Sequence, residues 1–173
     1  MERRVLEVVA YNPEWPQRFE AEQALLREAL GGVVVKVHHM GSTAVPGLPA
    51  KPIIDLLLEV SDLQELDERT PELEALGYKA KGENGITGRR YFQKGGLQRT
   101  HHLHAFKTGD AQVVRHLAFR DYLIGHPEVA REYADLKMRL AAGGTSVAKY
   151  QEGKEGFLAL HERLALTGGV ICV

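Results

Sequence analysis

The chain has 173 residues, of which 44% are hydrophobic and 26% are charged, and its formal net charge is −1. This length and composition predict a single globular domain over residues 1–173, with a substantial core. A net charge near zero argues against general binding of duplex nucleic acid and leaves open only a local basic patch.

The chain also lacks the usual signals for export or membrane insertion. Its single cysteine, Cys172, excludes an intrachain disulfide. The segment Met1-Glu2-Arg3-Arg4 does not open a secretory signal, and no apolar window is long enough to span a bilayer. We therefore expect a cytoplasmic protein without a membrane partner.

The first predicted element is a helix that ends at Gly31-Gly32. Asn12 and Pro13 are typical of a helix start, and the apolar residues from Trp15 to Leu30 recur at helical spacing. Residues 33–40 then form an apolar, β-branched run that predicts a strand.

Gly41-Ser42 follows that strand directly. Three prolines make residues 43–51 an ordered loop rather than a helix. Residues 53–60 predict a second strand, apolar enough to be central in a sheet.

The second half predicts a hairpin and then helices. A capping box at Ser61 opens a helical stretch to Leu76, which Pro71 interrupts. Residues 89–94 and 101–106 predict two strands joined across Gly95-Gly96. Three helices follow, the first ending at Gly125, the second running from Pro127 to Gly143-Gly144, and the third from Ser146 to Leu166. This order predicts an α+β fold, a small mixed β-sheet flanked by helices.

The Gly-Ser turn and Asp55 are the strongest indication of function. Backbone N–H groups in the turn of Gly41, Ser42 and Thr43 can approach a phosphate, and Asp55 on the next strand can hold a bridging cation. A charged Asp55 needs a cation, a metal or N–H donors when buried; a structural bond to the loop is the alternative. For His39, at the end of the preceding strand, we expect a core histidine bonded to the loop rather than a catalytic group.

His102 and His104 share one face of their predicted strand, because side chains alternate along a strand. Two imidazoles on one surface can ligate a metal or contact a phosphate. Together with Asp55 they predict a site for a divalent metal ion, if the strands are neighbours. Imidazole ligands favour a zinc-, manganese- or nickel-like ion over magnesium.

Basic side chains provide candidates for the phosphate-binding group. Arg90 and Lys94 are predicted on one face of their strand, near the histidine pair, and a solvated, positively charged strand edge is the alternative. Lys51 lies beside the Gly-Ser loop, and Tyr150 and Lys154 are one helical turn apart. For His116, Arg120 and Asp121 we expect ion pairing among helices.

Several long strings in this order resemble the GrpB family, small bacterial proteins of poorly defined function. The strings are Tyr11–Trp15, His39–Leu48, Lys51–Asp55, Arg89–Phe92, His102–His104, Leu117–Leu123 and His126–Pro127. The GrpB family is placed in the polymerase-beta-like nucleotidyltransferase superfamily. The resemblance therefore implies a nucleotidyltransferase-like sheet, with an active site on a Gly-Ser turn and strand carboxylates that hold two metal ions.

This sequence departs from the superfamily pattern at the second carboxylate position, which is Leu57. A leucine cannot bind Mg²⁺, so two functions remain open. One is metal-dependent nucleotidyl or phosphoryl transfer with Asp55 as the catalytic carboxylate. The other is a non-catalytic module that binds a nucleotide or small phosphorylated ligand and acts on a protein partner. Similar domains appended to dephospho-CoA kinase imply a link to coenzyme A metabolism.

Overall fold

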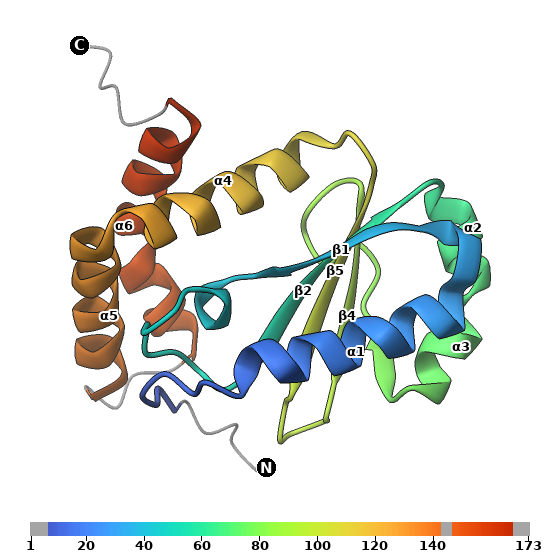
Figure 1. Ribbon diagram of the computed structural model, residues 1–173, viewed down its shortest axis with the longest axis horizontal. Coiled ribbons are helices and arrows are strands. Elements are labelled where there is room, and N and C mark those ends of the chain that lie inside the picture. Colours follow the sequence, from blue (N-terminus) through green and yellow to red (C-terminus); the bar gives the residue numbers. More distant parts are fainter. Residues whose placement is uncertain (1–6, 143–146, 168–173) are drawn as a thin grey trace.

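The computed structural model describes residues 7–142 and 147–167 (Figure 1). Cys172, the N-terminal tetrapeptide, Gly143-Gly144 and Ser146 lie outside these residues. The helices of four or more residues are α1 (Trp15–Leu30), α2 (Leu63–Glu68), α3 (Thr70–Ala75), α4 (Ala111–Gly125), α5 (Pro127–Ala142) and α6 (Val147–Leu166). The strands are β1 (Val34–Met40), β2 (Ile54–Val60), β3 (Tyr78–Ala80), β4 (Arg89–Lys94) and β5 (His101–Lys107). Two short 3₁₀ turns, η1 (Gly31–Val33) and η2 (Ser42–Ala44), flank β1.

The five strands form one mixed sheet in the order β1-β2-β5-β4-β3. Only the central pair, β2 and β5, is parallel, and the other neighbours are antiparallel. In that parallel pair Asp55 lies beside His102 and Leu57 lies beside His104. The chain therefore brings together two strands that are nearly fifty residues apart, and the predicted α+β class with a mixed sheet is confirmed.

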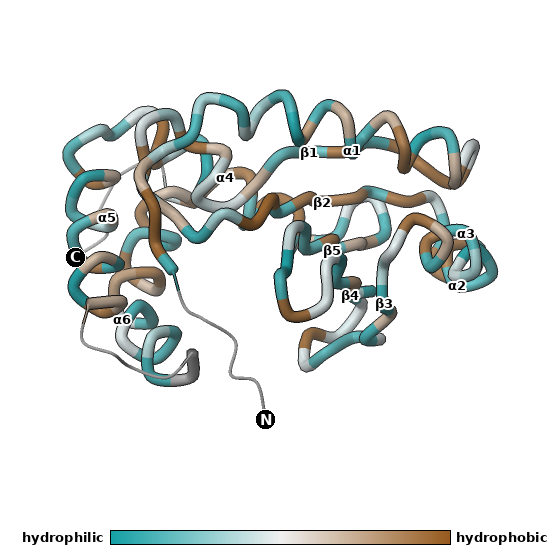
Figure 2. Tube along the Cα trace, turned by 90° about the horizontal axis from the view of Figure 1, so that it is seen from below, coloured by the Kyte–Doolittle hydropathy of each residue, from teal (hydrophilic) through white to brown (hydrophobic). Residues whose placement is uncertain are grey.

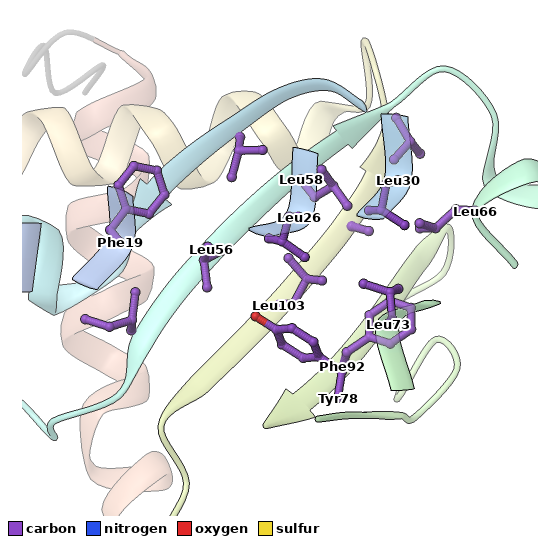
Figure 3. Close-up of a cluster of buried hydrophobic side chains, with 14 of the residues drawn as sticks. Phe19, Leu26, Leu30, Leu56, Leu58, Leu66, Leu73, Tyr78, Phe92 and Leu103 are labelled. Atoms are coloured by element: carbon purple, nitrogen blue, oxygen red, sulfur yellow. The ribbon is translucent and has the colours of Figure 1, made fainter. Parts of the chain in front are cut away.

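One face of the sheet carries the main hydrophobic core, beneath α1, α2 and α3. Figure 3 shows Leu26 and Leu30 of α1 clustered with Leu56, Leu58 and Leu103 of the central strands. These five leucines are fully buried. Burial of a leucine side chain contributes about 1.5–3 kcal/mol, so this layer supplies much of the stability that holds β2 and β5 in register.

The opposite face meets a group of three helices, α4, α5 and α6, which lie together at one end of the sheet (Figures 1 and 2). A second apolar cluster joins this group to the loop after η2, where Val45 and Leu48 pack against Leu123, Val129 and Tyr133. Because the prolines exclude a long helix here, the segment forms a loop, and this loop packs the helical group against the sheet.

Local sequence signals explain most of the element boundaries. The Asp62 side chain caps α2 by accepting from Glu65 N at 3.0 Å, and α2 and α3 are separate helices that meet at Arg69. A bulge near Val35 leaves that side chain 48% exposed, although strict alternation along residues 33–40 predicts that it faces the core. The sequence analysis also missed the three-residue edge strand β3.

In the part of the chain that the structure describes, no helix combines the length and the apolar content needed to cross a bilayer.

Candidate functional site

A cavity of about 580 Å³ opens between the second face of the sheet and the group of α4, α5 and α6. Its wall includes the Gly41–Thr43 turn, the ends of β2, β4 and β5, and one side of each of these three helices. Five basic side chains line the cavity: Lys51, Arg89, Arg120, Lys137 and Lys154. Among the residues that the structure describes, only two carboxylates do so, Asp55 and Glu162. The cavity is therefore suited to an anionic ligand.

Gly41 is required by the close approach of the turn to β2. Its φ of 73° lies in the left-handed region, where glycine is favoured. A Cβ at this position would lie 2.7 Å from Asp55 Oδ2. The Gly-Ser turn and the aspartate are thus in direct contact, as the sequence predicts for a shared site.

Asp55 receives two imidazoles from the neighbouring strand. His104 Nε2 lies 3.3 Å and His102 Nδ1 lies 3.5 Å from Asp55 Oδ1. Burial favours the protonated carboxyl, but hydrogen bonding to His102 and His104 outweighs it and holds the pKa of Asp55 below its usual range. The aspartate is therefore ionised at neutral pH.

Arg89 determines which nitrogen of His104 carries the proton. Its guanidinium is held by the carbonyl oxygens of Glu83 and Asn84, and Nη1 lies 3.4 Å from His104 Nδ1. Because arginine can only donate, His104 Nδ1 accepts this hydrogen bond. The proton is then on His104 Nε2, which donates a hydrogen bond to Asp55 Oδ1.

A metal ion could be held by Asp55, His102 and His104, whose ligand atoms lie within 4.8 Å of one another. This set does not fit the two-metal arrangement, because Leu57 is fully buried among Met40, Phe106 and Val113. A single ion bound to His104 Nε2 would displace the proton from that nitrogen. The proton could not move to Nδ1, because Nδ1 accepts the hydrogen bond from Arg89, so the ring would be left without a proton. The residues present therefore fit two magnesium ions poorly and one imidazole-bound ion only after Arg89 moves.

Lysines from the helices face this triad across the cavity. Lys137 on α5 is 2% exposed and Lys154 on α6 is 8% exposed. Burial, together with Lys154 and Lys51, lowers the pKa of Lys137 to about 7, and burial with Lys51 lowers that of Lys154 to about 8. Asp55 partly opposes both shifts, so its charge acts on both lysines.

Two tyrosines, Tyr133 and Tyr150, contact these lysines and line the same cavity. The Nζ atoms of Lys51 and Lys154 lie 5.2 Å and 4.7 Å from the centroid of the Tyr150 ring, and Lys137 Nζ lies 4.8 Å from that of Tyr133. Burial raises the pKa of Tyr150 to about 12, so its hydroxyl is neutral at physiological pH. Cation–π contacts partly stabilise the lysines but supply no countercharge.

Most of the residues predicted from the sequence line this one cavity: Gly41, Ser42, Thr43, Lys51, Asp55, His102, His104, Tyr150 and Lys154. Arg90 and Lys94 are the exceptions, and their predicted place beside the histidine pair is wrong. Arg90 binds Asp67 through Nε and Nη2, and Lys94 pairs with Glu22 of α1. Both side chains leave β4 on the face that carries the main core, because Arg89 and Tyr91 occupy the cavity face.

Arg89, Arg120, Lys137 and His116 line the cavity but were not predicted as site residues. Alternation along residues 89–94 places Arg89 and Arg90 on opposite faces, and the alignment of β4 with β5 places Arg89, not Arg90, on the face of His104. His116 was expected in a helix ion pair; instead burial, His104 and Arg115 lower its pKa to about 4. Lys137 lies within an amphipathic helix, where nothing distinguishes it from a surface lysine.

His39 has the structural role expected for it. Its Nε2 lies 2.8 Å from Thr43 Oγ1, and its ring stacks on Phe19 with centroids 4.9 Å apart. It joins β1 to η2 on the core face and does not line the cavity.

Comparison with known proteins identifies the family. A family model described as GrpB protein matches residues 5–163. This chain belongs to the GrpB family. The crystal structure of GrpB from Enterococcus faecalis is 43% identical and superposes with a TM-score of 0.90, over 94% of this chain and 98% of that chain.

Two relatives of the GrpB domain are longer than this chain. UPF0157 protein YqkA of Bacillus subtilis (strain 168) is 44% identical over 94% of this chain and 48% of its own length. The chain thus spans about half the length of that relative. A dephospho-CoA kinase of Mycobacterium leprae (strain TN) is 27% identical over 87% of this chain and 44% of its length.

Proposed function

We propose that this GrpB domain binds a nucleotide or another small phosphorylated ligand in the cavity between the sheet and the helical group. The proposal rests on one observation, the excess of five basic side chains over two carboxylates around a single cavity. Phosphate is the common biological anion that arginine and lysine side chains bind through several oxygens at once.

The Gly-Ser turn supports the same proposal. Gly41 allows the turn to approach Asp55 closely, and Ser42 lines the cavity. In the superfamily that the sequence resembles, such a turn receives phosphates. The volume of about 580 Å³ lies within the range usual for small-molecule sites.

Nucleotidyl or phosphoryl transfer is the catalytic form of this proposal. It would require a divalent ion at Asp55, His102 and His104 to supply charge neutralisation at the phosphates. The buried Leu57 at the second carboxylate position favours the other form, a module that binds its ligand without chemistry. The similarity to dephospho-CoA kinases makes dephospho-CoA a reasonable ligand to test.

Differential scanning fluorimetry with ATP, UTP, AMP and dephospho-CoA tests this proposal. Each ligand is added in EDTA and then with Mg²⁺, Mn²⁺ or Zn²⁺. We expect at least one ligand to raise the melting temperature. Release of pyrophosphate or orthophosphate on incubation would support transfer, and a shift without turnover would support the binding module.

The double variant His102→Ala/His104→Ala tests the site. We expect it to reduce the ligand-induced shift more than the stability of the ligand-free protein. His101→Ala on the same strand is the control, since His101 faces Glu22 on the other face of the sheet. If no phosphorylated compound shifts the melting temperature under any condition, the proposal is wrong.

A further inference from the structure

Lys137 and Lys154 are buried cations without a protein countercharge. Neither forms an ion pair with a carboxylate of residues 7–142 and 147–167, and Lys137 Nζ has no hydrogen-bond partner there. The Tyr150 hydroxyl beside them is also buried and unpartnered within the same residues. Unsatisfied buried polar groups are rare because each costs free energy, so this group requires an explanation.

A divalent cation does not provide that explanation. The superfamily uses metal ions to neutralise the phosphates, and the carboxylates that hold them are reduced here to Asp55. The second carboxylate position is the buried Leu57. Of the two imidazoles, that of His104 accepts a hydrogen bond from Arg89. A divalent ion placed at Asp55 would in addition repel the lysines, because both already interact with that carboxylate's charge.

We propose that Lys51, Lys137 and Lys154 replace the divalent cation, and that they bind a polyphosphate chain directly. This inference rests on the proposed function and specifies how its ligand is held. Three ammonium groups match the charge of a di- or triphosphate better than that of a single phosphate. The Tyr150 hydroxyl supplies a neutral donor to a phosphate oxygen. Asp55 opposes the bound anion and is not needed for its binding.

The low pKa values of the two lysines agree with this arrangement. An anion between the lysines favours their charged forms, so binding raises both pKa values and takes up protons from solution. The other titratable or charged groups that line the cavity come from the sheet, the loop and the helices: Asp55, Arg89, His102, His104, Lys51, His116, Arg120, Tyr133, Tyr150 and Glu162.

Isothermal titration calorimetry with inorganic tripolyphosphate, ATP and orthophosphate in EDTA tests the inference. We expect tripolyphosphate and ATP to bind without a divalent ion, and each to bind at least about tenfold more tightly than orthophosphate. Excess Mg²⁺ should weaken binding, because it competes with the lysines for the phosphate oxygens. Asp55→Asn should increase the affinity, because it removes the carboxylate charge that opposes the bound anion.

Charge removal at the lysines gives the matched comparison. Lys137→Met and Lys154→Met keep most of the side-chain volume, and each should lower the tripolyphosphate affinity by about tenfold or more. Lys149→Met, at an exposed position of α6 outside the cavity, should leave it unchanged. Thermal unfolding of each variant verifies that the fold is retained.

The outcomes separate this inference from the proposed function. Binding that requires Mn²⁺, Zn²⁺ or Mg²⁺ and disappears in Asp55→Asn overturns the lysine-held arrangement and leaves the phosphate ligand in place. Equal affinities of Lys137→Met, Lys154→Met and the unmodified protein also overturn it. Absence of binding to all three phosphates, with and without metal, overturns both.

Discussion

Two groups of buried charges lie on opposite faces of the same sheet, and they differ in how they are satisfied. On the core face, Glu22 is 4% exposed and accepts from Tyr78 Oη at 2.7 Å and from Lys94 Nζ at 2.8 Å. His101 Nε2 lies 3.6 Å from the same carboxylate. On the cavity face, Lys137 and Lys154 have a similar degree of burial but no carboxylate partner among the described residues.

This difference separates a structural charge group from a binding group. The Glu22 group is closed, since every member has a partner supplied by the protein, and it links α1 to β3, β4 and β5. The lysine group has no carboxylate ion-pair partner within residues 7–142 and 147–167, and in the proposed arrangement a bound anion supplies its countercharge. Buried ion pairs are lost at a high free-energy cost when one partner is removed, whereas removal of an unpaired buried charge relieves a cost. The two groups should therefore respond to substitution with opposite signs.

The largest effect is expected for Glu22→Ala. This change leaves the Lys94 ammonium and the Tyr78 hydroxyl without their acceptor, so the free energy of unfolding should fall by about 3–5 kcal/mol. Urea denaturation followed by circular dichroism measures it. Affinity of the remaining folded protein for tripolyphosphate should not change, because Glu22 lies on the other face. A loss below about 1 kcal/mol would show that the closed group is not structural.

Lys137→Met should have the opposite sign. Burial lowers the pKa of Lys137 from 10.5 to about 7, which means that the folded state disfavours the charged amine. Removing that amine should raise the free energy of unfolding of the ligand-free protein, by on the order of 2 kcal/mol near neutral pH. The same urea titration measures the gain. A decrease in stability, in protein without ligand, would mean that Lys137 has a structural partner.

The pH dependence sharpens this comparison. Between the folded pKa of about 7 and the unfolded value of 10.5, the unfolded state binds more protons at Lys137 than the folded state does. Stability should therefore rise as the pH increases through this window, and Lys154 should add to the rise above its own pKa of about 8. In Lys137→Met the slope should decrease by up to about 1.4 kcal/mol per pH unit. Saturation with tripolyphosphate should further reduce the slope of stability against pH.

The same comparison explains which features the sequence could predict. Strands β1, β2, β4 and β5, the hairpin and the late helices follow from local patterns, because alternation along one strand and a turn are short-range properties. The convergence of Asp55 with His102 and His104 was predicted only on the condition that their strands are neighbours, and the parallel pairing of β2 with β5 meets that condition. Arg90 and Lys94 were assigned to the wrong face for a long-range reason. Alternation determines that Arg89 and Arg90 point apart, but only the alignment of β4 with β5 determines which of them joins His104. The burial of Lys137 in the cavity depends on how α5 packs against the loop, and no local sequence pattern encodes that packing.

Gly41→Ala should have an intermediate effect on both stability and binding. The new Cβ would lie 2.7 Å from Asp55 Oδ2 and the residue would keep a φ of 73°, so either the turn or the carboxylate must move. We expect a loss of about 1–2 kcal/mol in the free energy of unfolding. Gly47→Ala is the control for backbone strain alone, since Gly47 also has a positive φ but a Cβ there meets no atom within 4 Å. If both variants lost the same free energy of unfolding, contact with Asp55 would not be the reason that glycine is needed at position 41.

The smallest effect is expected for Arg90→Ala, which tests the corrected placement of that residue. Arg90 Nε and Nη2 lie 2.8 Å and 3.2 Å from the two carboxylate oxygens of Asp67, whose side chain is 46% exposed. A partly exposed ion pair of this kind contributes less than about 1 kcal/mol, even with two hydrogen bonds. The tripolyphosphate affinity should be unchanged, whereas Arg89→Ala, on the adjacent position and the cavity face, should weaken it. Calorimetry on the two variants compares the two faces of the sheet directly, because Arg89 and Arg90 are adjacent residues of one strand. A loss of affinity in Arg90→Ala that equals the loss in Arg89→Ala would mean that the ligand is not confined to the cavity face of the sheet.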